Sequence, residues 1–125
     1  MKLEELAKED IYDELFEMAN IHHDVHGIDD IVIWVGMANK RHGLRVKVSN
    51  RKGKFDPTDH FNIQMPSLDY EPPKVAKWIT TKHLRKIFEW IKINQDLLYD
   101  YENGEIDNTL VFLNKLVSIG KDYEN

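Results

Sequence analysis

Seven cationic side chains lie between residues 40 and 54, and their density is the clearest chemical signal in this chain. They are Lys40, Arg41, Arg45, Lys47, Arg51, Lys52 and Lys54, and residues 31–55 contain no Asp or Glu. Such a cluster can contact the phosphates of a nucleic acid or the carboxylates of an acidic protein surface. Lysine and arginine are also common on open sheet faces, where they oppose aggregation. The stretch therefore predicts a binding surface, with a solvated sheet face as the simpler interpretation.

The charge of the chain is divided by segment. The net charge is −8 over residues 1–30, +8 over residues 31–95 and −5 over residues 96–125, although the whole chain carries only −5. Such a division indicates either acidic ends that pack on a basic middle or a basic face kept for a partner. Because the whole chain is acidic, we expect a discriminating contact rather than general binding to DNA.

The histidines could provide a different chemistry. His22, His23 and His26 fall within five residues, and Asp24 lies between them. His22 and His26 would share one helix face, but the sequence lacks the glutamate of the H-E-x-x-H zinc pattern. We therefore predict no metal site here and expect these residues to stabilise the carboxyl end of a helix that stops before Gly27.

Three further histidines, His42, His60 and His83, could act as an acid or a base near neutral pH, and His42 and His60 flank predicted strands. The sequence does not show whether the two approach each other. Other catalytic signatures are weak. The chain has no cysteine, no nucleophile elbow and no glycine-rich phosphate loop. The segment Asp69–Lys74 is only loosely similar to the acidic–acidic–lysine arrangement of nucleases, and two prolines interrupt it. We predict no cofactor.

The positions of these residues depend on the strands and helices that carry them. Hydrophobic periodicity predicts an amphipathic helix from Leu3 to His22 and strands at 30–37, 44–49 and 60–65. It also predicts a second long helix, which Thr80 or Thr81 caps and which runs to about Tyr101, and a last helix that Asp107 or Asn108 caps and Gly120 ends. In the last helix, Leu110, Leu113, Leu116 and Val117 recur at helical spacing.

Two of the strands alternate between apolar and polar residues, which separates their side chains into two faces. Arg45 and Lys47 then share the polar face with His60, Asn62 and Gln64 if the strands pair. The residues between these strands read as a basic hairpin turn that a glycine at positive φ completes.

The chain reads as a single α+β domain, 1–125. We expect a two-layer fold in which a three-stranded, mainly antiparallel sheet packs on an N-terminal helix and two C-terminal helices. The amino terminus lacks the pattern of a secretory signal, and no apolar run reaches the length of a membrane span. We therefore expect a cytoplasmic protein without a membrane partner.

The predicted strands and the helix after them also carry a recurring pattern. The chain reads His42-Gly43-Leu44-Arg45-Val46-Lys47-Val48, then His60 to Met65, then Leu84-Arg85-Lys86-Ile87 with Ile91, Asn94 and Leu97-Leu98. Over roughly residues 31–102 this resembles a small bacterial family of unknown function, whose members carry a Pro-Pro-His-x-His-Val strand and a helix with Asn and Trp. Members often lie beside a small partner gene in toxin–antitoxin-like pairs. Only His42 matches a histidine of that motif; Arg41 stands in place of Pro, and Leu44 or Arg45 in place of the second His. The resemblance implies a small α+β module that acts through a partner.

We expect a small non-enzymatic binding or regulatory protein, of phage or toxin–antitoxin-like type. Its basic β-hairpin face would contact an acidic protein partner or nucleic acid, and the chain could also form a homo-oligomer. The candidate contact residues are Lys40, Arg41, His42, Arg45, Lys47, Arg51, Lys52, Lys54, His60 and Asn62. The alternative is a metal-dependent or histidine-dependent nuclease that uses His22, His26, His42 or His60.

Overall fold

The computed structural model describes residues 18–21, 23–36 and 43–119. In chain order the elements are β1 (Met18–Ile21), α2 (His23–His26), β2 (Ile33–Gly36), β3 (Arg45–Ser49), β4 (His60–Gln64), the 3-10 helix η1 (Pro72–Lys74), α3 (Thr81–Ile93), α4 (Gln95–Glu102) and α5 (Thr109–Lys115). Within this described part of the chain, no helix is long and apolar enough to cross a membrane.

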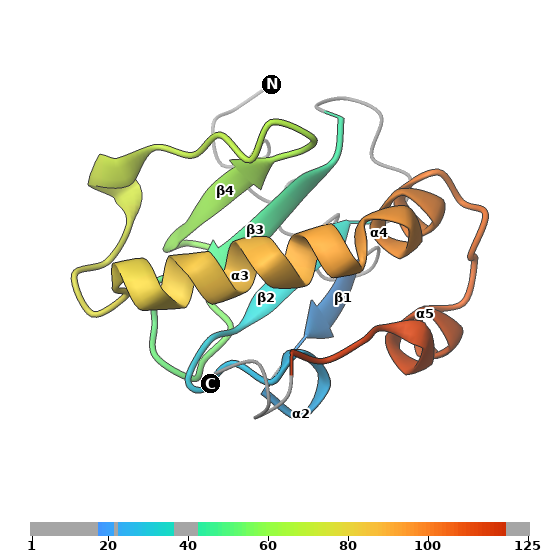
Figure 1. Ribbon diagram of the computed structural model, residues 1–125, viewed down its shortest axis with the longest axis horizontal. Helices are drawn as coiled ribbons and strands as arrows, with labels where there is room; N and C mark the ends of the chain where they lie inside the picture. The colour runs from blue at the N-terminus through green and yellow to red at the C-terminus, as the bar shows by residue number, and fades with distance from the viewer. Residues whose placement is uncertain (1–17, 22, 37–42, 120–125) are drawn as a thin grey trace, which may run out of the picture.

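The strands form one antiparallel sheet in the order β1-β2-β3-β4, so that β4 is an outer strand. Figure 1 shows α3 crossing in front of this sheet. The alternating apolar residues of β3 and β4 face the helices, where Val48 pairs with Phe61 and Val46 pairs with Ile63. All four side chains are almost fully buried in one core cluster, which also includes residues of α3, α4 and α5. The predicted α+β class with an antiparallel sheet is therefore confirmed, although the sheet of the described residues has four strands where three were expected.

The amino-terminal side of the sheet corrects one prediction. Residues Met18–Ile21, expected at the end of a helix, form strand β1 instead. They pair antiparallel with β2, where Ile21 lies opposite Ile33, and both of these side chains are fully buried. The burial of Ile21 in the sheet overrides the helical spacing that the sequence displays. The rest of the predicted helix, residues 3–17 and His22, lies outside the described residues.

The helix predicted from Thr81 to about Tyr101 is two helices, with a break at Asn94. The buried Asn94 side chain explains the break, because its Nδ2 donates hydrogen bonds of 2.9 Å to the carbonyls of Trp90 and Val117. Its Oδ1 accepts a hydrogen bond of 2.7 Å from the N–H of Val117. These bonds hold the residues after α5 in an extended form, so the last helix ends at Lys115 and not at the predicted Gly120.

Several predicted helix boundaries are confirmed. Thr80 caps α3 in a reciprocal arrangement with His83, and the Asn108 side chain accepts hydrogen bonds at the start of α5. Gly27 follows α2 with a φ of 82°, a conformation that suits glycine. The buried side of α5 differs from the predicted leucine stripe. Phe112 is buried and stacks on Tyr101, whereas Leu110 is 71% exposed.

Candidate functional site

The polar face of the β3–β4 hairpin holds four of the predicted contact residues. Lys47 lies opposite Asn62, and Arg45 lies opposite Gln64 one pair further along the ladder. His60 occupies the other end of β4, opposite Ser49. Because successive strand residues point to opposite faces, these side chains lie on the side of the sheet away from the apolar core.

This polar face ends in a pocket of about 450 Å³ beside β4. The lining residues are Arg45, His60, Phe61, Asn62, Gln64, Asp69, Tyr70, Glu71 and Lys74. The far wall is the segment 69–74, which runs past the outer edge of β4 before the chain enters α3 (Figure 1). That segment is attached at both ends, because the Gln64 N–H donates to the Asp69 carbonyl and Asn50 Nδ2 donates to the Lys74 carbonyl.

His60 is an electrically neutral member of this site at pH 7. Burial lowers the pKa of His60 below its ordinary value, and the positive charges of Lys47 and Arg45 lower the pKa further. The Pro57 carbonyl and the Asn62 amide oppose this shift without reversing it. His60 Nδ1 lies 3.1 Å from the Pro57 carbonyl oxygen, so Nδ1 carries the proton and Nε2 is left as an acceptor.

Asn62 has a polar atom that the fold does not use. Its Oδ1 is buried, and in the described part of the chain it accepts no hydrogen bond. A buried acceptor without a donor costs about 1–3 kcal/mol of stability, so such atoms are uncommon and often mark sites of function. Asn62, a residue of the pocket lining, therefore carries a buried acceptor that the described residues leave unsatisfied.

Trp34 lies on the polar face of the sheet, where its ring contacts other aromatic side chains. Its side chain is fully buried, as the sequence predicts, although its pairing with Lys47 places it on the face opposite the helices. Phe55 packs against the Trp34 ring at 4.8 Å, edge to face, and the His60 ring lies 5.2 Å away. The sequence indicates a doubly covered strand here, because 31–35 is apolar throughout.

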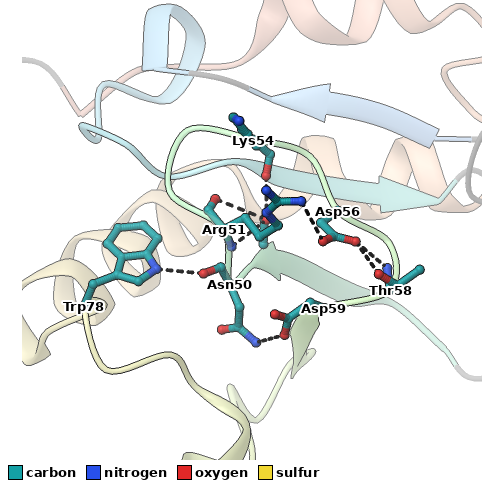
Figure 2. Close-up of polar contacts among 8 residues, drawn as sticks. Asn50, Arg51, Lys54, Asp56, Thr58, Asp59 and Trp78 are labelled. Atoms are coloured by element: carbon teal, nitrogen blue, oxygen red, sulfur yellow. Dashed lines mark hydrogen bonds and ion pairs between the residues drawn. The ribbon is translucent and has the colours of Figure 1, made fainter.

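The cations of the predicted basic turn are partly compensated by acids. Arg51 lies 3.6 Å from Asp56, and Lys52 lies 3.8 Å from Asp30, so each pairs with a carboxylate on a neighbouring part of the surface. Figure 2 shows Arg51 reaching Asp56, and Thr58 bonding to the same carboxylate. The hydrogen bonds from Thr58 hold the pKa of Asp56 below its ordinary value. The turn is therefore a mixed-charge surface and not a purely basic one.

Asn50 has a role that sequence reasoning missed. Its side chain donates to an Asp59 carboxylate oxygen at 3.0 Å and to the Lys74 carbonyl at 2.9 Å, and it accepts from the Ala76 N–H at 2.9 Å. Its backbone carbonyl accepts from the Trp78 indole at 2.7 Å (Figure 2). The sequence shows Asn50 only as one polar turn residue among several, and no local pattern indicates contacts with partners more than 20 positions away.

The structure excludes the buried His26 as a functional residue of the histidine-dependent nuclease, which is the alternative prediction from the sequence. Its Nδ1 accepts from the Ile28 N–H at 2.8 Å, and its Nε2 donates to the Ile31 carbonyl at 2.7 Å. Both ring nitrogens are therefore used to shape the connection between α2 and β2, and neither is available to a metal or a substrate.

The remaining predictions on this site divide between described and undescribed residues. Among the described residues, no group of three His, Cys, Asp or Glu side chains could hold a metal ion. Lys54 is exposed at the tip of the turn. Lys40, Arg41, His42 and His22 lie outside the described residues, as does the side chain of Asp24.

Comparison of the chain with protein-family models, with curated proteins and with solved structures finds no match.

Proposed function

We propose that this chain is a non-enzymatic binding protein whose polar β3–β4 face receives an acidic segment of a partner protein. The observation that carries the proposal is the pocket beside β4, which gathers Arg45, His60, Asn62 and Lys74 in one concave site. Pockets of this volume are typical of sites that receive a ligand or an inserted side chain. The family that the sequence resembles implies the same mode of action, through a partner in a toxin–antitoxin-like pair.

Charge favours a protein partner over nucleic acid. Arg45 and Lys47 place two cations on the polar face, while Asp69 and Glu71 line the same pocket, and Glu71 lies 3.4 Å from Lys74. Acids beside the cations repel a continuous phosphate backbone, whereas they tolerate a segment with only one or two carboxylates. The carboxylates that pair with Arg51 and Lys52 in the turn also weaken its attraction for a phosphate backbone.

His60 supports a second candidate, a histidine-dependent nuclease. Its neutral imidazole, with Nδ1 bound to the Pro57 carbonyl, would suit a general base next to cations that could stabilise a phosphate. The acidic residues of the pocket weigh against this candidate. Cleavage of labelled RNA or DNA that His60→Ala abolishes would favour the nuclease over the binding protein.

Fluorescence anisotropy with defined probes tests the proposal. A labelled peptide with one or two Glu residues among apolar residues, and labelled single- and double-stranded oligonucleotides, are titrated with the chain at two salt concentrations. We expect saturable binding of the peptide that weakens with salt and that falls about tenfold in the double variant Arg45→Glu, Lys47→Glu, since each reversed charge near an interface costs on the order of 1 kcal/mol.

Lys115→Glu is the matched control, because it reverses an exposed charge in the last turn of α5. Its affinity for the peptide should stay near that of the unchanged chain. Tighter binding of an oligonucleotide than of the peptide would assign the face to nucleic acid and refute the proposal.

A further inference from the structure

The outer edge of β4 has backbone groups that point away from the sheet. Hydrogen bonds from Met65 N–H to the Leu44 carbonyl and from Asn50 N–H to the Asp59 carbonyl, both 3.0 Å, bracket the β3–β4 ladder. In an antiparallel ladder, hydrogen-bonded pairs alternate with non-bonded pairs. The odd-numbered residues of β4 therefore bond to β3, and the backbone groups of His60, Asn62 and Gln64 point outward.

Among the described residues, only one of these three has its outward backbone groups hydrogen-bonded within the chain. The Gln64 N–H donates to the Asp69 carbonyl at 2.8 Å, and the Gln64 carbonyl accepts from the Leu68 N–H at 2.7 Å. The N–H and C=O of His60 and Asn62 have no corresponding partner among the described residues. His60 and Asn62 are both among the residues that line the pocket of about 450 Å³.

An exposed strand edge is a template for another extended chain, and proteins usually protect such an edge with charge, proline or a covering loop. Here the segment 69–74 passes the edge but is held away from it, because Asp69 and Lys74 are attached at opposite ends of β4. Unpaired N–H and C=O groups in alternation complement an extended backbone better than they complement a helix or a nucleic acid.

We infer that β4 binds an extended segment of a partner protein as a fifth strand, which pairs with the backbone of His60 and Asn62. This inference rests on the proposed function and specifies how the acidic partner binds. The partner segment lies in the pocket between β4 and the segment 69–74.

The surroundings of the edge define the side chains of that segment. A residue opposite Asn62 points to the polar face, about 5 Å from β4 and within reach of the long Lys47 and Arg45 side chains. Its two neighbours point to the other face, where Tyr70 packs between Phe61 and Phe88.

Tyr70 also lines a second pocket, of about 230 Å³, between the segment after it and the start of α3. Its apolar lining includes Val75, Ala76, Ile79 and Leu84. The preferred segment therefore alternates apolar, acidic and apolar residues.

The test uses a displayed library of short random peptides, selected on the full chain. We expect selected sequences to show this alternation, and we expect Asn62→Pro to bind them at least about tenfold more weakly than Asn62→Ala. Both variants lose the Asn62 side chain, but only proline removes the outward N–H, and it removes no bond to β3. Selected peptides that bind equally to both variants would overturn strand addition.

A second measurement keeps the inference testable if the proline variant does not fold. A selected peptide is methylated on the backbone nitrogen that faces β4, and a matched peptide is methylated at the next nitrogen. Strand addition predicts a loss of affinity of about tenfold for one of the two and little change for the other. Equal affinities would overturn it.

The outcomes also separate this inference from the proposed function. Peptides that lose affinity in the Arg45→Glu, Lys47→Glu variant but not in Asn62→Pro would leave an acidic partner on the polar face and overturn only the added strand. A library that yields no saturable binder would overturn the added strand, while the Glu-containing probe peptide still tests binding of an acidic segment to the polar face. Dimerisation of the free chain that Asn62→Pro abolishes would assign the edge to a second copy and overturn the inference.

Discussion

The indole nitrogen of Trp78 donates a 2.7 Å hydrogen bond to the backbone carbonyl of Asn50, which joins the segment before α3 to the β3–β4 turn. The Asn50 side chain reinforces this junction with bonds to the Lys74 carbonyl and the Ala76 N–H. One turn residue therefore fixes the far wall of the pocket relative to β4. The geometry of the candidate site depends on this junction as much as on the residues that line the site.

We predict that Asn50→Ala lowers the free energy of unfolding by about 2 kcal/mol, because three side-chain hydrogen bonds are lost and each contributes about 0.5–1.5 kcal/mol. Urea unfolding followed by Trp fluorescence measures the change. Asn114→Ala is the control, since Asn114 is exposed on α5 and should change the free energy by less than about 0.5 kcal/mol. Equal effects in the two variants would contradict the role of Asn50.

A second prediction concerns the buried His26. His26→Leu keeps an apolar group of similar size but leaves the Ile28 N–H and the Ile31 carbonyl without their partners. We expect a loss of about 3 kcal/mol in the free energy of unfolding, since each orphaned buried group costs about 1–3 kcal/mol. Chemical denaturation provides the measurement. A loss below about 1 kcal/mol would show that the α2–β2 connection does not depend on the imidazole.

The strands of the hairpin could be predicted from sequence because their information is local. Val46 and Val48 alternate with Arg45 and Lys47, and this period of two fixes both the strand and the face that each side chain occupies. The capping signals at Thr80 and Asn108 are local in the same sense, so the starts of two helices could be predicted as well.

The errors arise where distant residues decide the local structure. Asn94 has no helix-breaking signal in its own neighbourhood, and it interrupts the helix because its side chain binds Val117, 23 positions away. Met18–Ile21 forms a strand because its backbone pairs with β2, which lies more than ten positions later in the chain. The candidate site could be predicted only in part for the same reason. The polar face follows from alternation, whereas the pocket depends on Asn50 holding the segment 69–74 in place.

A third prediction follows from the pKa of His60, which burial and the cations of β3 hold below the ordinary value of about 6.5. Below that pH the unfolded chain binds a proton that the folded chain resists, so the free energy of unfolding falls as the pH drops from about 6.5 toward the lowered pKa. His60→Gln should reduce this slope. The variant should still show some dependence of the free energy of unfolding on pH, because burial also lowers the pKa of His83.

Urea unfolding of both chains across this pH range measures the slopes, and an NMR titration of the His60 ring measures its pKa directly. A stability that rises as the pH falls through this window would contradict the neutral state assigned to His60.

Replacement of asparagine by valine should change the free energy of unfolding in opposite directions at Asn62 and at Asn94. Asn62 Oδ1 is buried and accepts no hydrogen bond from the described residues, so Asn62→Val removes an unsatisfied acceptor from a strand and adds a β-branched side chain. We expect it to raise the free energy of unfolding by about 0.5–1 kcal/mol. Asn94→Val removes three hydrogen bonds of a side chain that is 1% exposed, and we expect a loss of at least about 3 kcal/mol. Urea unfolding of the two variants measures both changes in the free energy of unfolding. A loss at Asn62 comparable with that at Asn94 would mean that the Asn62 amide stabilises the fold, and the pocket would then hold no spare acceptor for a partner.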